Sequence, residues 1–240
     1  MQNNPIGIFD SGVGGTSIWR EMIKLLPEEN TIYLADSKNA PYGEKTPTDI
    51  LNLSIKNTEL LLARGCKLIV VACNTATTNA ISHLRAQYDL PFIGIEPAIK
   101  PAALKSKTKT VGVLATKGTL SSELFSKTSK DHAANITIVE REGIGLVSLL
   151  ESGELHSRKT SELLQEYLSP MLAANMDHLV LGCTHYPYLM PILKQLLPED
   201  VKIIDCGEAV AKQTERVLNQ HKLRNVSGKE GMHQLYTNGE

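Results

Sequence analysis

Short apolar runs alternate with amphipathic segments along nearly the whole chain. PIGIF, TIYLA and KLIVVA are the first such runs, and segments with helical periodicity follow them. Runs of four to six apolar, often β-branched residues that end in turn residues are typical of buried parallel strands. Strands that alternate with helices predict a parallel sheet covered by helices. The expected fold class is therefore α/β.

In the first half of the chain the pattern predicts four strands and three helices. The expected strands are residues 5–9, 31–35, 67–72 and 91–95, and the expected helices are residues 16–26, about 49–64, and a segment after residue 73. Thr48 or Asp49 is the expected cap of the second helix, and Gly65 ends it. The loop SKNAPYGEKTP contains Pro and Gly, which predict irregular structure.

The second half repeats this layout weakly, because TVGVLATKGTLSSELF resembles GIFDSGVGGTSIWREM. Its expected strands are 110–115, 135–140, 178–182 and 201–205, with helices at 146–152, 158–174 and 208–220. The last strand and helix should lead back to the first half, and the final 20 residues look loosely specified. We expect two pseudo-symmetric α/β domains with largely parallel sheets, residues 1–98 with about 208–240 and residues 99–207, and an active site in the cleft between them.

Two cysteines, Cys73 and Cys183, end strand-like runs at equivalent places in LIVVACNTATTNA and LVLGCTHYPYL. Ligands in open α/β sheets bind at the carboxyl ends of strands. Two thiols placed there from two halves can face one substrate from opposite sides, which suits proton transfer from one face of a carbon to the other. A helix start should favour the thiolate and lower each pKa from about 8.5.

Simpler interpretations compete with this one. A cysteine at a strand end is often a small buried hydrophobe, the interpretation we favour for Cys66 and Cys206. A zinc site at Cys183 and His185 lacks a CxxC and a second ligand pair of usual spacing, so no metal is expected.

Acidic and imidazole side chains near strand ends are candidates to relay protons to these thiols. They are Asp10, Asp36, Glu151 and His185. Each alone is as compatible with a cap or a solvated side chain. The turn DSGVGG lacks the GxGxxG and GK[ST] patterns, but its backbone N–H groups can hold a carboxylate.

Composition points to a small ligand. The 240 residues carry 25 Lys and Arg against 26 Asp and Glu, a net charge of −1 that favours neither nucleic acid nor an anionic membrane. Four cysteines do not resemble a disulfide framework. Because no signal-like segment begins the sequence and no apolar run approaches about 18 residues, a cytoplasmic protein is expected.

Four linked motifs, FDSGVGG, PYGEK, ACNTATT and LGCTHYP, occur in this order across the chain. In these motifs the chain resembles the glutamate racemases of the cofactor-independent aspartate/glutamate racemase superfamily. The resemblance implies a bacterial enzyme that interconverts L- and D-glutamate by a two-thiol proton transfer without a cofactor, supplying D-glutamate for peptidoglycan. It also implies two pseudo-symmetric α/β domains and a homodimer.

The resemblance carries roles onto matching positions. Cys73, supported by Asp10, acts on the D-glutamate face, and Cys183, supported by His185, acts on the L-glutamate face. Asp36 and Glu151 match acidic positions that support the catalytic residues. The residues that match substrate-binding positions are Asp10, Ser11, Tyr42, Gly43, Asn74, Thr75, Thr116, Thr119, Thr184 and His185.

Two departures from the common pattern matter. Many members have Arg where this chain has Asn39, and a Cys-Pro pair where it reads REGIGLVSLLESGE, which makes the match of Glu151 less direct. Both features are similar to the Gram-negative proteobacterial branch. Some of its members depend on a nucleotide-linked peptidoglycan precursor, UDP-N-acetylmuramoyl-alanine, as activator.

Other functions stay open from sequence. One alternative is another racemase of the superfamily, acting on aspartate or a hydantoin. Aspartate is one methylene shorter than glutamate, and a binding pocket discriminates a methylene by only about 1–3 kcal/mol. A related decarboxylase needs one thiol, and both are present here. A non-catalytic binding module, or an inhibitor of another enzyme such as DNA gyrase, would not need the intact set of thiols, acid and imidazole.

Overall fold

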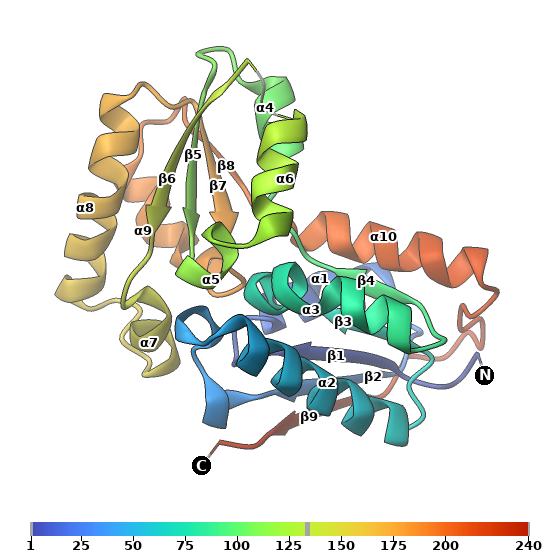
Figure 1. Ribbon diagram of the computed structural model, residues 1–240. Coiled ribbons are helices and arrows are strands. Elements are labelled where there is room, and N and C mark those ends of the chain that lie inside the picture. Colours follow the sequence, from blue (N-terminus) through green and yellow to red (C-terminus); the bar gives the residue numbers. More distant parts are fainter. Residues whose placement is uncertain (1, 133–134, 240) are drawn as a thin grey trace.

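The computed structural model describes residues 2–132 and 135–239, which form two parallel β-sheets covered by helices (Figure 1). The strands are β1 (Ile6–Asp10), β2 (Thr31–Ala35), β3 (Leu68–Val71), β4 (Phe92–Gly94), β5 (Thr110–Ala115), β6 (Thr137–Glu142), β7 (His178–Gly182), β8 (Lys202–Ile204) and β9 (His233–Thr237). The strand order is β4-β3-β1-β2-β9 in one sheet and β6-β5-β7-β8 in the other. All pairs are parallel, which confirms the expected α/β class.

The two sheets repeat one another. Read from the opposite edge, the second sheet has the order β8-β7-β5-β6, which matches β4-β3-β1-β2 strand for strand. In this match β3 corresponds to β7, and β1 corresponds to β5. The segments that follow these four strands therefore occupy equivalent places in the two halves.

Helices cover both faces of the first sheet because its strands are apolar on both sides. On one face lie α1 (Thr16–Leu25) and α10 (Gly207–Gln220), and on the other lie α2 (Pro47–Ala63) and α3 (Asn74–Gln87). Alternate β1 residues divide between them: Ile6 and Ile8 join the cluster with α1 and α10, whereas Phe9 joins the one with α2 and α3. Continuous burial explains the unbroken apolar runs in the sequence.

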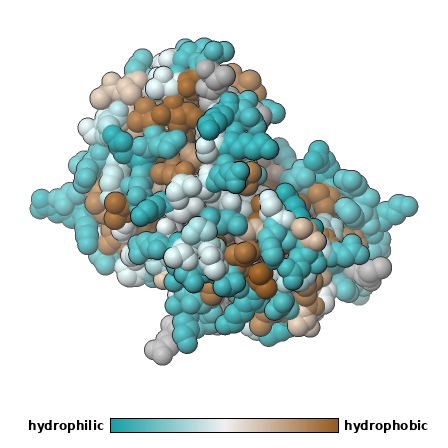
Figure 2. Space-filling model, in the orientation of Figure 1, coloured by the Kyte–Doolittle hydropathy of each residue, from teal (hydrophilic) through white to brown (hydrophobic). Residues whose placement is uncertain are grey.

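The second sheet is covered in the same way. On one face lie α7 (Leu146–Glu151), α8 (Arg158–Ala173) and α9 (Met190–Leu196), and on the other lie α4 (Ile99–Lys105), α5 (Lys117–Leu120) and α6 (Glu123–His132). On the face shown in Figure 2 hydrophilic side chains predominate, with apolar ones in separate patches. None of the described helices is long and apolar enough to cross a membrane.

The start of α2 and the loop before it differ from the prediction. Thr46, not Thr48 or Asp49, is the N-cap, because its hydroxyl accepts a hydrogen bond from the Asp49 N–H at 3.2 Å. Pro47 then fills the first helical position, where its missing N–H costs nothing. The preceding loop is not wholly irregular, since it contains two short 3₁₀ turns, η1 (Ser37–Asn39) and η2 (Tyr42–Glu44).

The C-terminal part also departs from the prediction. Of the strand and helix expected to lead back to the first half, α10 does so, whereas β8 stays in the second sheet beside β7. The final segment, expected to be loosely specified, forms β9 and pairs with β2. Four of the five β9 residues are exposed, so the strand lacks the apolar signal by which the others were found.

Candidate active site

The two thiols follow the equivalent strands β3 and β7. Cys73 is the N-cap of α3, and its Sγ accepts a hydrogen bond from the Ala76 N–H at 3.4 Å. Cys183 precedes the 3₁₀ turn η3 (Tyr186–Leu189), and not an α-helix as expected. Both cysteines are buried and line one small cavity formed by residues of both halves. The structure therefore brings together the two thiols that the sequence singled out.

Most of the predicted substrate-binding residues line the same cavity. They are Ser11, Tyr42, Gly43, Asn74, Thr75, Thr116, Thr184 and His185. The cavity encloses about 10 Å³, room for roughly one water molecule. Pro41 and Val147 also line it, and sequence reasoning missed them because a loop proline and a valine in an apolar helix carry no chemical signal. The space between the two thiols is thus smaller than an amino acid.

Four predicted residues lie behind this lining. They are Asp10, Asp36, Glu151 and Thr119. Each forms a hydrogen bond with a residue that lines the cavity, respectively Thr184, Tyr42, His185 and Thr75. Thr119 completes a triangle of hydroxyls with Thr75, from the first half, and Thr116, at distances of 2.8 to 3.3 Å. These contacts connect the two halves beside Cys73.

Asp10 fixes the turn that follows β1. Its carboxylate accepts hydrogen bonds from the N–H groups of Gly12 and Gly15, at 3.3 and 2.8 Å, and from the Thr184 hydroxyl at 3.3 Å. A Cβ at Gly15 would lie 2.6 Å from the Asp10 Cβ, so only glycine fits there. Burial raises the pKa of Asp10, although His185 and the N–H donors act against this. Asp10 thus caps the turn and also contacts the second half.

Our prediction that a helix start lowers the pKa of Cys73 was wrong. Burial raises the pKa of this thiol well above its ordinary value, and the negative charge of Asp10 raises it further. The hydrogen bond from Ala76 lowers it by less. Cys73 therefore holds its proton in the closed site.

Cys183 has a cationic neighbour instead. His185 Nδ1 lies 3.7 Å from the Cys183 Sγ, and His185 Nε2 lies 2.5 Å from Glu151 Oε1. Burial alone would lower the pKa of His185, but Cys183 and Glu151 raise it well above its ordinary value. Burial alone would raise the pKa of Glu151, but His185 and the Val13 N–H, 2.8 Å away, lower it. The raised pKa favours the imidazolium form of His185, which sets a cation beside the Cys183 sulfur.

The two thiols therefore lie in opposite electrostatic settings. Cys73 is held neutral beside an acid, and Cys183 lies against a cation. One sulfur can accept a proton while the other donates one, which is the requirement for removing a proton from one face of a carbon and returning it to the other.

Asp36 lies behind Tyr42, a residue that lines the cavity. It is buried, and its carboxylate accepts hydrogen bonds from the Tyr42 hydroxyl and from Asn39 Nδ2, the latter at 2.7 Å. Burial and the bond to Asp36 raise the pKa of Tyr42 far above its ordinary value, so this hydroxyl remains a donor. Asp36 therefore contacts the lining of the cavity through Tyr42.

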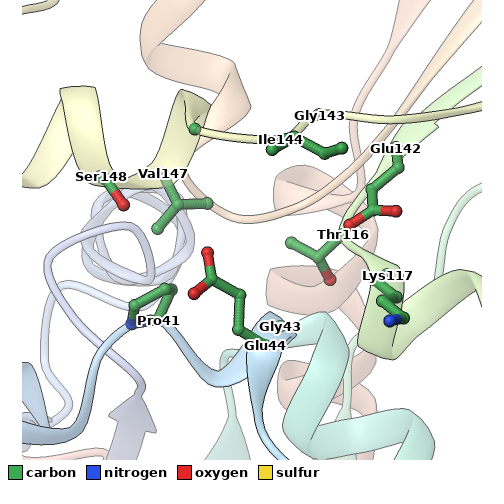
Figure 3. Close-up of a pocket in the computed structure, with 11 residues that line it drawn as sticks. Pro41, Gly43, Glu44, Thr116, Lys117, Glu142, Gly143, Ile144, Val147 and Ser148 are labelled. Atoms are coloured by element: carbon green, nitrogen blue, oxygen red, sulfur yellow. The ribbon is translucent and has the colours of Figure 1, made fainter.

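A larger cavity of about 240 Å³ adjoins the thiol cavity, with which it shares Pro41, Gly43, Thr116 and Val147. Figure 3 shows the Glu44 carboxylate projecting into it from the first half, with Lys117 and Glu142 on the opposite side. The two cavities therefore lie next to one another, and residues of both halves line each of them. Within the described residues, no group of three or more His, Cys, Asp or Glu is arranged to hold a metal ion.

Comparison with known proteins identifies the family. Residues 6–214 match the Asp/Glu/Hydantoin racemase family. The chain belongs to this family. Within it, the chain is 49% identical over 220 residues to the glutamate racemase of Ectopseudomonas mendocina, covering 91% of this chain and 84% of that protein. It is 47% identical over 214 residues to the glutamate racemase of Ralstonia pickettii, covering 89% and 76%.

Solved structures of the family have the same fold. Escherichia coli glutamate racemase, in complex with L-glutamate and the activator UDP-MurNAc-ala, superposes with a TM-score of 0.86 at 33% identity, over 98% of this chain and 90% of that chain. The relatives also confirm the predicted likeness to Gram-negative proteobacterial members.

Proposed function

We propose that the protein is a glutamate racemase that interconverts L- and D-glutamate by a two-thiol proton transfer without a cofactor. The observation that carries this proposal is that Cys73 and Cys183, at equivalent strand ends, line one small cavity. The glutamate racemases among its relatives support glutamate as the substrate. The product D-glutamate would supply peptidoglycan synthesis.

In the direction from L- to D-glutamate, the Cys183 thiolate removes the α-proton, so an S–H bond forms as the C–H bond breaks. The electron pair moves into the adjacent carboxylate. The Cys73 thiol then donates its proton to the opposite face of the carbon and becomes a thiolate. The reverse reaction starts from the Cys73 thiolate.

The developing negative charge requires hydrogen-bond donors that are in place before the reaction. Asn74 is suited to this task because it is buried, and among the described residues neither its Oδ1 nor its Nδ2 has a partner. A buried unpaired amide is costly and is expected to bind a ligand. Ser11, Thr75, Thr184 and backbone N–H groups complete the proposed set of donors.

Larger-scale features belong to the same proposal. Residues 1–98 with about 208–240 and residues 99–207 form two domains that open to admit glutamate and close to exclude water. The protein acts in the cytoplasm as a homodimer. UDP-N-acetylmuramoyl-alanine activates it, since the E. coli relative binds this type of molecule. Equal turnover with and without this precursor would remove the last point.

The test is to incubate the metal-depleted protein with L-glutamate in deuterium oxide, without pyridoxal phosphate, and to follow optical rotation and α-deuterium by NMR. Loss of rotation, with deuterium entering the inverted product, is the expected result. If nothing happens, with or without the peptidoglycan precursor, the proposal is wrong. Racemisation of aspartate alone, or carbon dioxide from an arylmalonate, would identify the related activities instead.

A further inference from the structure

The residue that follows β9 contacts the loop that carries Tyr42 and Gly43 to the cavity. Asn238 Nδ2 donates a hydrogen bond to Asp36 Oδ1 at 2.5 Å, and Asn238 Oδ1 accepts one from the Lys38 N–H at 3.0 Å. Its own N–H donates to the Ala35 carbonyl at 3.4 Å. One side-chain amide thus holds both the buried acid and the first turn of this loop.

Asp36 passes this contact on to the cavity. Its other oxygen accepts from the Tyr42 hydroxyl, and Asn57 Nδ2 donates to the same hydroxyl at 3.0 Å. Tyr42 is buried in the cluster that contains Cys73, and both Tyr42 and Gly43 line the cavity. Asp36 is buried, and its Oδ1 accepts from both Asn238 Nδ2 and Asn39 Nδ2, so loss of the Asn238 amide removes one of the two donors that hold this oxygen.

The strand does not depend on Asn238 for its own position. Five residue pairs, from Thr31 with His233 to Ala35 with Thr237, join β9 to β2 before the chain reaches Asn238. Removing the Asn238 amide should therefore leave the strand in place and release the loop.

We infer that Asn238 is a positioning residue for the active site, which holds Asp36 and η1 so that Tyr42 and Gly43 face the substrate. This inference rests on the proposed function for its kinetic consequence. Its structural consequence, order in residues 36–44, is independent of the substrate.

The first test compares Asn238→Ala with the control Gln234→Ala. Gln234 lies in β9, and its side chain accepts a hydrogen bond from the exposed Tyr236. We expect kcat/KM for glutamate to fall about tenfold in Asn238→Ala, chiefly through a higher KM, because misplaced groups bind substrate less well. The thermal unfolding midpoint should equal that of the control. Unchanged kinetics, or the same loss in both variants, would overturn the inference.

A second variant separates positioning from a general structural defect. Asn238→Asp keeps the acceptor for Lys38 but sets a second carboxylate against Asp36. We therefore expect kcat/KM to fall at least as far in Asn238→Asp as in Asn238→Ala, because the donor to Asp36 is lost and a like charge takes its place. An Asn238→Asp variant as active as the unsubstituted protein would contradict this role.

Hydrogen exchange tests the same inference without turnover. Amides of residues 36–44 should exchange faster in Asn238→Ala than in Gln234→Ala, with exchange elsewhere in the first sheet unchanged. If the unsubstituted protein fails to racemise glutamate but shows this difference, the proposed function is wrong and the positioning role stands. If it racemises glutamate and the two variants exchange alike, only the positioning role is wrong.

Discussion

Each thiol has a different charged neighbour, Asp10 for Cys73 and His185 for Cys183. We therefore expect neither sulfur to replace the other. We expect Cys73→Ser and Cys183→Ser each to lower racemisation by at least about 10³-fold, because a serine hydroxyl neither accepts nor donates the α-proton readily. Glutamate binding should persist, since Asn74 and the threonines remain. Turnover and calorimetric binding check this, and full activity in either variant would refute the two-thiol mechanism.

The carboxylate of Glu151 raises the pKa of His185, with which it forms a hydrogen bond. Glu151→Gln removes its negative charge, so the pKa of His185 should fall and the alkaline limb of the rate–pH profile should move to lower pH. The direction of this change follows from the raised pKa of His185. A raised imidazole pKa keeps the cation, and the stability it brings, at low pH and loses both as pH rises through the folded-state pKa.

The control for this prediction is Glu154→Gln, at an exposed glutamate that bonds to Ser152 and not to His185. Rate–pH profiles of both variants should be measured beside the unsubstituted protein. An alkaline limb that stays in place in Glu151→Gln would show that this carboxylate does not control the protonation of His185.

At the scale of elements, the buried ion pair of Lys67 and Glu29 joins three separate segments. Lys67 Nζ lies 2.6 Å from Glu29 Oε2, and Glu29 Oε1 accepts from the Asn225 N–H at 2.8 Å. Both charged side chains are at most 2% exposed. Lys67→Met should therefore lower the free energy of unfolding by about 3–5 kcal/mol, because it leaves a buried charge unpaired.

Combining Lys67→Met with Glu29→Gln should restore most of this loss, because glutamine still accepts from Asn225 and carries no charge. Urea unfolding at neutral pH measures both variants. If the double variant is as unstable as Lys67→Met, the loss comes from packing around the lysine stem and not from an unpaired charge.

The sequence predicted most of the elements because buried parallel strands are apolar throughout. It missed β9, whose exposed residues carry no such signal and whose position depends on pairing with β2. It placed Asp10, Asp36 and His185 near the site, because strand ends gather at one edge of a sheet. It did not predict that Asp36 faces Tyr42, or that burial outweighs the helix start at Cys73, since both depend on tertiary neighbours.

At the scale of the whole molecule, the repeat of four strands explains why the site lies between the halves. Equivalent strand ends supply Cys73 and Cys183, and the cavity of about 10 Å³ is smaller than glutamate, which is why we propose that the halves open to admit the substrate. In the structure the loop of η2 lies in close contact with the segment after β5, where the proposed closure brings the halves together. A Cβ at Gly43 would lie 2.8 Å from the Thr116 Cβ, across that contact.

Gly43→Ala should therefore prevent full closure. We expect kcat/KM to fall by about 10²-fold, because a displacement of about 1 Å between the thiols and the substrate costs that much. Unfolding should change little, since each sheet keeps its own core. The control is Glu44→Ala, one residue further along the loop, which removes atoms at the mouth of the cavity and adds none between the halves. Steady-state kinetics and thermal unfolding decide the matter: equal kcat/KM in the two variants would mean that the site reacts without the closed contact between Gly43 and Thr116.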